Sequence, residues 1–451
     1  MTQAQPQRTT SDLVKAAVSG WLGTALEFMD FQLYSLGAAL VFHEIFFPEQ
    51  SAAMALILAM GTYGAGYIAR IVGAFIFGRM GDSIGRKKVL FITITMMGIC
   101  TTLIGVLPTY AQIGIFAPVL LVTLRIIQGL GAGAEISGAG TMLAEYAPKG
   151  KRGIISSLVA MGTNCGTLSA TAIWAVMFFA LDREQLLAWG WRVPFLASVV
   201  VMIFAIWLRM NLKESPVFEK VNDAQTAQPD TSLGAMVKSK SFWLATGLRF
   251  GQAGNSGLIQ TFLAGYLVQT LLFDKAIPTD ALMISSILGF ISIPLLGWLS
   301  DKVGRRLPYI TAIILAYPML SIIVDKSYAP GTIMLSIIVI HNFAVLGLFA
   351  LENITMAEMF GSRNRFTRMA ISKEAGGLVA VGFGPVLAGI FCNMTGSWWP
   401  IVAMLVAYSV IGLVSACLMP EVRDRDLSAA EDAAEATPKE PVAYGTVSSR
   451  R

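Results

Sequence analysis

The sequence predicts an all-α membrane protein in which twelve transmembrane helices form two pseudo-symmetric six-helix bundles. Of its 451 residues, 55% are hydrophobic and only 14% are charged, whereas about 25% of residues are charged in a typical soluble protein. The mean hydropathy of +0.65 is too high for a soluble core of this size, so lipid is the expected solvent. The other two observations are a series of long apolar runs and a motif repeated across the midpoint.

Twelve apolar runs are long enough to cross a bilayer, which requires about 20 residues of helix. They lie at 16–42, 54–78, 88–107, 113–145, 153–180, 190–211, 241–272, 280–300, 308–325, 331–359, 367–392 and 399–419. The longest polar stretch before the C-terminal tail, 212–240, separates six runs from six. The predicted organisation is a tail (1–15), an N-terminal bundle (16–211), a linker (212–240), a C-terminal bundle (241–420) and a second tail (421–451).

The distribution of basic residues predicts that both termini are cytoplasmic. Of the 33 Lys and Arg residues, 25 lie in the two tails and in one set of alternate loops, to which Arg209 is assigned. The loops on the opposite side hold only Arg183, Lys275 and Lys326. Positive charge marks the cytoplasmic side of a membrane. With no cleaved signal peptide in the polar first fifteen residues, we expect a multi-pass protein of a bacterial inner membrane. Because the basic residues lie in short loops, the net charge of +5 does not indicate a nucleic-acid partner.

A Gly-Asp-Gly-Arg loop occurs once in each half. Gly78-Arg-Met-Gly-Asp-Ser-Ile-Gly-Arg-Lys87 matches Gly297-Trp-Leu-Ser-Asp-Lys-Val-Gly-Arg-Arg306, and an Ala-Glu pair with a following Arg also repeats, in nearly the same register. Glycine permits a tight turn, and the acids can cap helix ends or pair with arginines in one conformation. The expected gating residues are Gly78, Asp82, Gly85, Arg86, Lys87, Glu145, Arg152, Asp301, Gly304, Arg305, Glu358 and Arg365. The alternative is that these basic loops only set the topology. Repeated halves predict a substrate site between them and alternating access by rocking.

Nine ionisable residues fall inside the apolar runs. They are Glu27, Asp30, Arg70, Arg125, Glu135, Arg249, Glu352, Lys373 and Glu374. At about 3 kcal/mol each on insertion scales, exposing all nine to lipid would cost roughly 27 kcal/mol, more than a typical folding stability of about 5–15 kcal/mol. We therefore expect these side chains to face one another or a water-filled cavity.

Glu27 and Asp30 are the first candidates for proton coupling. They are three residues apart and share one helix face. Two carboxylates this close disfavour double ionisation, so one of them is expected to bind a proton in the physiological range. The alternative is that either acid neutralises a buried arginine.

Glu135 and His341 are further candidates for the proton path. A histidine within a membrane can relay protons, although His341 could equally be a hydrogen-bonded packing residue.

Arg125 is expected near mid-membrane, where its guanidinium could grip a substrate carboxylate with two hydrogen bonds. A permanent ion pair with Glu27, Asp30 or Glu135 is the alternative. Arg249 and Lys373 lie nearer the cytoplasmic ends of their helices and could reach the membrane interface instead. The expected substrate-binding residues are Arg125, Arg70, Arg249, Gln128, Asn164, Asn255 and Glu352. Interhelical hydrogen bonding is the alternative for the amides.

Several other classes of function are disfavoured. The glycine run at 129–140 resembles a dinucleotide loop by spacing, but no strand precedes it, so close helix packing is expected. The sequence has no Walker phosphate loop and no nucleophile–base constellation, so neither an ATP-driven pump nor an enzyme is predicted. The four cysteines lie in apolar segments without metal-ligand spacing. We expect no cofactor beyond the proton as coupling ion.

These motifs resemble the major facilitator superfamily and, within it, the metabolite:proton symporter family. The similarity covers about residues 15–430 and is closest to enterobacterial inner-membrane metabolite transport proteins. It is carried by Glu27-Phe-Met-Asp30-Phe31-x-x-Tyr34, Ala69-Arg70-x-x-Gly73-Ala74, the loop 78–88, Arg125-x-x-Gln128-Gly129, Gly133-x-Glu135, Trp189-Gly-Trp-Arg192-x-Pro194-Phe-Leu196, Glu214-Ser-Pro-x-Phe218 and Pro420-Glu-x-Arg-x-Arg-Asp-Leu427. Two positions depart from the family pattern: Phe28-Met29 replaces Trp-Tyr, and Ile71 replaces a proline.

The resemblance implies a major-facilitator fold and import of organic acids or of zwitterions. The preferred interpretation is secondary active, proton-coupled symport of a small carboxylated metabolite, an organic anion, by a monomer. Uptake of a zwitterionic osmolyte such as proline or betaine is the first alternative; the short tail at 421–451 lacks the heptads of a regulatory coiled coil, and the loss of the aromatic pair weakens a quaternary-ammonium site. Proton-driven export and a substrate sensor without net transport are further alternatives.

Overall fold

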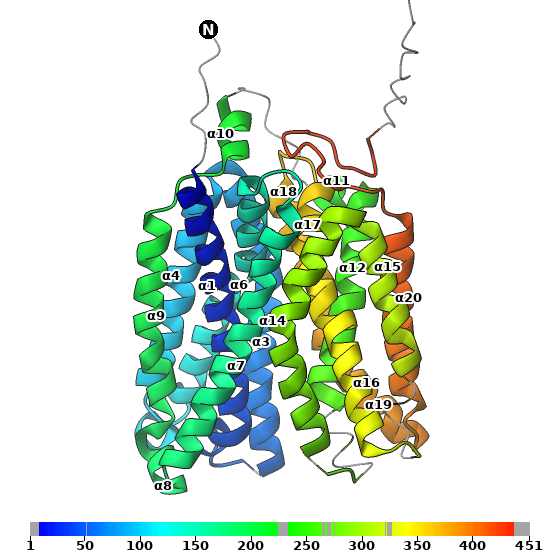
Figure 1. The fold of residues 1–451 in the computed structure, drawn as a ribbon. Coiled ribbons are helices and arrows are strands. Elements are labelled where there is room, and N and C mark those ends of the chain that lie inside the picture. Colours follow the sequence, from blue (N-terminus) through cyan, green and yellow to red (C-terminus); the bar gives the residue numbers. More distant parts are fainter. Residues whose placement is uncertain are drawn as a thin grey trace, which may run out of the picture.

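The computed structural model describes residues 9–50, 52–223, 233–263, 267, 272–274, 276–320, 322 and 327–436. Within these residues all regular structure is helical, and the long helices stand side by side as roughly parallel rods (Figure 1). Eight helices of the described part are long and apolar enough to cross a membrane. Large apolar side chains such as Phe179, which is 95% exposed, face outward, whereas most charges inside the rods are buried. This inverted pattern confirms the predicted membrane fold.

The N-terminal bundle contains six rods. The first rod is α1 (Thr10–Gly37), continued by η1 (Ala38–Phe42) and α2 (His43–Phe46). The others are α3 (Ala52–Ser83), α4 (Arg86–Val106), α6 (Phe116–Tyr146), α7 (Arg152–Ala180) and α9 (Arg192–Met210), and short elements α5 (Tyr110–Ile113), α8 (Arg183–Gln185) and η2 (Leu186–Gly190) join them. The first rod begins before the predicted start, because Thr9 and Asp12 form a capping box.

The C-terminal bundle follows the short helices α10 (Pro216–Asp223) and α11 (Leu233–Lys238). Its rods are α12 (Lys240–Ser256) with η3 (Gly257–Leu263), α14 (Ala276–Val303), α15 (Arg306–Ala316) with η4 (Tyr317–Met319), α16 (Pro330–Ile340) with η6 (His341–Gly347) and α17 (Leu348–Met359), α18 (Arg365–Gly377) with η7 (Leu378–Gly382) and α19 (Gly384–Thr395), and α20 (Trp399–Leu418). The predicted runs at 241–272 and 308–325 extend into residues outside the described part of the chain.

The glycine run at 129–140 packs helices together, as predicted. A Cβ atom added to Gly129 or Gly133 would collide with the backbone carbonyl oxygens of Gly66 and Arg70 on α3, and one added to Gly73 would collide with the carbonyl of Leu130. α3 and α6 therefore approach backbone to backbone, as small residues permit in membranes. This contact fixes the position of Arg70 in the protein centre.

The two bundles meet along two helix pairs. α3 of the first bundle packs on α18 of the second, and α14 of the second packs on α7 of the first. The described start of α1 and the segment 420–436 lie at the same end of the rods, at the top of Figure 1. We call this end, with the loops at 84–85 and 147–151, the termini face.

Candidate functional site

At the termini face, the first Gly-Asp-Gly-Arg loop reaches across to the other bundle. The carboxylate of Asp82 accepts hydrogen bonds from the backbone N–H groups of Phe366 (3.2 Å) and Thr367 (2.8 Å) in the first turn of α18. A carboxylate is favoured there because the N-terminus of a helix carries partial positive charge. The guanidinium of Arg86 lies 3.4 Å from Asp82 and 3.5 Å from Glu145. The carboxylate of Asp82 in the first bundle thus caps α18 of the second bundle.

The second loop makes the same contacts in the opposite sense. Asp301 accepts hydrogen bonds from the backbone N–H groups of Gly153 (2.7 Å) and Ile154 (3.0 Å) in the first turn of α7. Arg305 pairs with Asp301 at 2.9 Å and with Glu358 at 2.7 Å. Each loop aspartate of one bundle therefore caps a helix that belongs to the other bundle.

One arginine from the opposite bundle completes each cluster. Arg365 pairs with Glu145 at 2.6 Å, and Arg152 pairs with Glu358 at 3.4 Å. Each buried glutamate thus lies between an arginine of its own bundle and an arginine of the other. The structure brings the expected gating residues together in two related clusters, with the exception of Lys87, whose ammonium donates to the carbonyl oxygen of Met210.

Two glycines form the turns of these loops. Gly85 has a φ of +111° and Gly304 a φ of +98°, values that L side chains rarely adopt, so glycine is required at both turns. Gly78 serves a different purpose, because a Cβ atom there would lie 2.8 Å from the Cα atom of Thr367. Gly78 therefore permits α3 to approach α18.

Two glutamates that sequence reasoning left without a role cap the helices after these turns. Glu214 accepts hydrogen bonds from the backbone N–H groups at the start of α4, at 3.0 Å from that of Arg86. Glu421 does the same for α15, at 2.8 Å from the N–H of Arg305. Burial raises the pKa of the Glu214 carboxyl. Both residues lie in the family-like segments quoted above, and each follows shortly after the last apolar run of its half, which is the signal that could have identified them as a pair.

The segment 421–436 lies across the termini face and contacts both clusters. The carbonyl oxygen of Arg425 accepts from Arg152 at 2.8 Å, and that of Leu427 accepts from Arg365 at 2.6 Å. The carboxylate of Asp424 accepts from the backbone N–H of Gly150 at 2.7 Å. The sequence predicted only a polar tail here.

Arg70 on α3 lies where the two bundles meet. Its Nη1 atom is 2.7 Å from Glu27 on α1 of the same bundle. Its Nε and Nη2 atoms donate to the two carboxylate oxygens of Glu374 on α18, at 2.8 Å and 2.9 Å. All three side chains are buried. Arg70 is therefore a cation held between a carboxylate of each bundle.

Asp30 does not share a partner with Glu27, although the two lie on one helix. Asp30 lies 3.5 Å from Arg125 and accepts from Thr101 at 2.7 Å, and Gln128 donates to it. The guanidinium of Arg125 lies 4.0 Å from the centre of the Tyr34 ring. All of these residues belong to the N-terminal bundle. The sequence left two roles open for Arg125, a substrate contact or an ion pair, and in this structure Arg125 forms an ion pair with Asp30.

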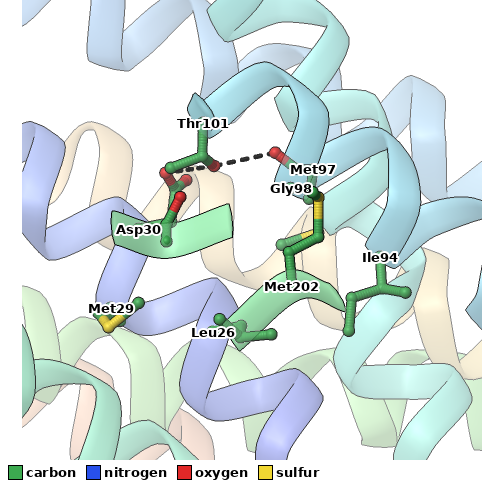
Figure 2. Close-up of a pocket in the computed structure, with 9 residues that line it drawn as sticks. Leu26, Met29, Asp30, Ile94, Met97, Gly98, Thr101 and Met202 are labelled. Atoms are coloured by element: carbon green, nitrogen blue, oxygen red, sulfur yellow. Dashed lines mark hydrogen bonds between the residues drawn. The ribbon is translucent and has the colours of Figure 1, made fainter. Parts of the chain in front are cut away.

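Figure 2 shows a small cavity beside Asp30 with room for roughly one water molecule. Its polar lining comes from the carboxylate of Asp30 and the hydroxyl groups of Thr101 and Ser198, and its apolar lining includes Met97 and Met202. The cavity lies between α1, α4 and α9.

Glu135 is bound to Arg209, a residue that the sequence assigned to a loop. Arg209 is 1% exposed and donates to Glu135 at 2.9 Å and to the carbonyl of Leu90. Thr93 donates to the same carboxylate at 2.8 Å. The loop assignment of Arg209 is wrong, because this arginine lies inside α9 and neutralises a buried acid rather than contacting solvent.

The second bundle holds a cluster of its own. Glu352 on α17 lies 3.4 Å from Arg249 and 3.1 Å from Lys373. Arg249 also donates to Gln252 at 2.7 Å, and the ammonium of Lys373 donates to Asn353 at 2.6 Å. Lys373 is 3% exposed, so it does not extend to the membrane interface.

The remaining expected polar residues lie farther from these charges. His341 is hydrogen-bonded to Ser285 and Gln260, each at 2.6 Å. Asn164 on α7 donates to the carbonyl of Ser286 on α14 and thereby joins the two bundles. Asn255 donates to Ser409 and to its own helix within the second bundle.

Among the described residues, the ion pairs inside the rods and apart from the termini-face clusters join five acids to five bases. The acids are Glu27, Asp30, Glu135, Glu352 and Glu374, and the bases are Arg70, Arg125, Arg209, Arg249 and Lys373. Each base has an acid partner, because an uncompensated charge would be costly in the membrane. A ligand that brings charge into this centre must be accompanied by the opposite charge.

The family model of the Major Facilitator Superfamily matches residues 20–324 and residues 252–451. The chain is 84% identical over 417 residues to the Escherichia coli (strain K12) protein YdfJ, over 91% of this chain and 97% of that protein. It is 33% identical to the shikimate transporter of Escherichia coli (strain K12), over 90% and 94% of the two chains. It is 29% identical to the proline/betaine transporter of Salmonella typhimurium, over 94% and 86%. The structure matches the MFS proton:xylose symporter XylE bound to 6-bromo-6-deoxy-D-glucose with a TM-score of 0.75 at 18% identity, over 94% and 99% of the chains.

Proposed function

This chain belongs to the Major Facilitator Superfamily, a family of transporters and not of enzymes, and from this premise we propose that it imports a small carboxylated metabolite together with protons. The observation that carries the proposal is the buried guanidinium of Arg70 at the contact of the two bundles, where repeat-built transporters bind their substrates. An arginine pairs with a carboxylate through two parallel hydrogen bonds. Arg70 therefore fits a substrate carboxylate better than Arg125, which lies within one bundle.

Proton coupling is assigned to the acids of α1. Glu27 has one oxygen on Arg70, and its Oε2 atom is buried without a hydrogen-bond partner among the described residues. Asp30 adjoins the water-sized cavity and Arg125. Protonation of either acid would release part of the hold on an arginine. Glu135 and His341 are weaker candidates, because Arg209 holds the former and two neutral side chains bind the latter.

Alternating access is assigned to the two clusters at the termini face. Their cross-bundle caps and ion pairs are formed in this structure, and they have to part when that face opens. We place this face in the cytoplasm of a bacterial inner membrane, because the basic loops lie there. A monomer suffices, since one chain contains both bundles.

Uptake of a zwitterion is the second candidate, and the names of relatives include both a shikimate and a proline/betaine transporter. A carboxylate is common to both classes, so Arg70 alone does not separate them. The aromatic rings do: Phe349 already lies 5.4 Å from the guanidinium of Arg249 and 5.3 Å from the ammonium of Lys373. Rings occupied by protein cations offer no cage for a quaternary ammonium group, which favours the anion.

The test uses proteoliposomes that contain the purified protein and a labelled panel of shikimate, 2-oxoglutarate, lactate, proline, betaine and xylose. We expect uptake of a carboxylate that requires an inward proton gradient and stops when an uncoupler is added. Asp30→Asn should abolish gradient-driven accumulation, and Arg70→Gln should abolish binding. Lys88→Gln, a change at an exposed residue, is the matched control. Accumulation of betaine alone would refute the anion assignment, and accumulation of none of these compounds with an intact protein would refute import.

A further inference from the structure

The ion pair between Arg70 and Glu374 has the geometry of a bound carboxylate ligand. The Nε and Nη2 edge of the guanidinium faces both oxygens of Glu374, at 2.8 Å and 2.9 Å. This two-bond arrangement is the one that an arginine makes with a substrate carboxylate. Here the protein itself supplies the acid, and it supplies it from the opposite bundle.

Among the described residues, each of the other bases on the helices around Glu374 is already paired with a different acid. The helices that pack on α18 carry Arg70 (α3), Arg249 (α12), Glu352 (α17), and Arg125 and Glu135 (α6); Glu27 on α1 shares Arg70, and Lys373 lies on α18 itself. Arg249 and Lys373 share Glu352, Arg125 is paired with Asp30, and Glu135 is paired with Arg209. Arg249 and Lys373 carry two positive charges against the one negative charge of Glu352. A Glu374 that left Arg70 would therefore have to share these two bases with Glu352 unless it bound a proton.

We propose that Glu374 occupies the place of the substrate at Arg70 in the empty transporter, and that a metabolite carboxylate displaces it. This inference rests on the proposed role of Arg70 as the substrate arginine. The incoming carboxylate forms two N–H···O bonds with Nε and Nη2, and the same two bonds to Glu374 break. The released Glu374 carboxylate then binds the coupling proton, which the acids of α1 transfer to it. No covalent bond to carbon changes.

The exchange conserves both hydrogen bonds and charge. One pair of charge-assisted bonds replaces another, so Arg70 is never left unpaired in a medium where that would be costly. The substrate adds one negative charge and the proton adds one positive charge, so the net charge of the ion-paired groups at this centre is unchanged. The predicted stoichiometry is one proton per carboxylate bound at Arg70, and a molecule without a carboxylate cannot complete the exchange.

The exchange of Glu374 for the substrate would also loosen the contact between the two bundles. In the empty state Arg70 and Glu374 tie α3 directly to α18, and these helices carry the first cross-bundle cap at their termini-face ends. When the substrate replaces Glu374, the ion pair that joins α3 to α18 at the centre of the protein is lost. Binding and release of the bundle contact are then one event.

The experiment measures binding and proton uptake together in the detergent-purified full chain. Binding of shikimate and of 2-oxoglutarate is followed by calorimetry, and protons bound per ligand are followed with a pH indicator in weak buffer. We expect wild-type protein to take up about one proton per ligand. Glu374→Gln removes the competing charge, so it should bind the same acid about tenfold more tightly and take up no proton.

Two further variants make the result decisive. Glu374→Asp retains a carboxylate, so it should restore proton uptake even if the glutamine variant folds poorly. Glu184→Gln changes an exposed acid and should behave as wild type. Weaker binding of the acid by Glu374→Gln would refute the displacement. So would proton uptake by Glu374→Gln, or uptake by wild type that differs clearly from one proton per ligand. In each of these cases the proposed transport of a carboxylate would still stand. If wild type binds neither acid, the proposed function fails and the inference fails with it.

Discussion

Gly297 offers a direct test of whether the contact between α7 and α14 closes the termini face. A Cβ atom added to Gly297 would lie 2.7 Å from the carbonyl oxygen of Gly153 and 2.9 Å from the Cβ atom of Ser157. Both neighbours belong to the other bundle, and the first is backbone, which cannot rotate away. Gly297→Ala therefore cannot be accommodated unless the two helices separate.

The size of the effect follows from the cost of overpacking. An additional methyl group in a tight contact costs about 1–3 kcal/mol. The cost applies only when the termini face is closed, because an opening motion separates the two helices. A difference of about 1–3 kcal/mol between two states changes their ratio by roughly 5–150-fold, so the open state should become readily detectable.

The assay is a distance measurement between spin labels on cysteines introduced at Lys88 and Lys302, two exposed positions on different bundles of the termini face, after replacement of the native cysteines. The described wild-type contacts predict a single distance population. Gly297→Ala should add a longer population without substrate. Gly64→Ala is the control, since a Cβ atom there meets no atom within 4 Å. An unchanged distance distribution in well-folded Gly297→Ala protein would show that this contact does not govern closure.

Three further predictions concern charge, packing and pH. Asp301→Asn and Asp82→Asn each remove a charge that caps a helix and pairs with an arginine, so each should destabilise the closed, folded protein by about 3–5 kcal/mol, measured by thermal unfolding in detergent; a large effect of only one of them would contradict the equivalence of the two clusters. Gly133→Val places a branched side chain against α3 and should abolish monodisperse protein in size-exclusion chromatography, whereas Gly331→Val, which has open space, should not. The backbone N–H of Ser428 holds the pKa of Asp426 below its usual value, so docking of residues 421–436 should be fully stabilised above about pH 4 and weaken as the pH falls further. A spin label at position 431 should become more mobile in that range, and Asp426→Asn should remove the change.

The sequence could predict the rods and the equivalence of the two termini-face clusters because both depend on local rules. Long apolar runs form spanning helices wherever they occur, and a Gly-Asp-Gly-Arg spacing that repeats in the same loop of each half implies equivalent contacts. Residue Asp82 meets α18, and residue Asp301 meets α7, as a pair of repeated halves requires. The π-helical segments η1, η2, η3, η6 and η7 have no such local signature and were missed.

The pairing of the buried charges could not be predicted from the sequence. Glu27 and Asp30 share a helix face, but they differ by about 4.5 Å along the axis, and each meets a different arginine. Arg209 lies near the end of an apolar run, where a loop residue and a buried base look alike. Its burial depends on Glu135 and on a carbonyl of α4, which only the packed structure brings together.

The symmetry of the two termini-face clusters does not extend to the centre of the protein. The register that aligns Asp82 with Asp301 aligns Arg70 with Gly289, and the register that aligns Arg152 with Arg365 aligns Met161 with Glu374. The place equivalent to the Arg70–Glu374 pair therefore holds a glycine and a methionine. Duplication of a six-helix unit would give identical surfaces at both levels. A rocking motion is compatible with identical contact surfaces in the two halves, because both halves perform the same movement. The Arg70–Glu374 pair occurs in one arrangement only, which is the asymmetry that a site for a single asymmetric molecule would require.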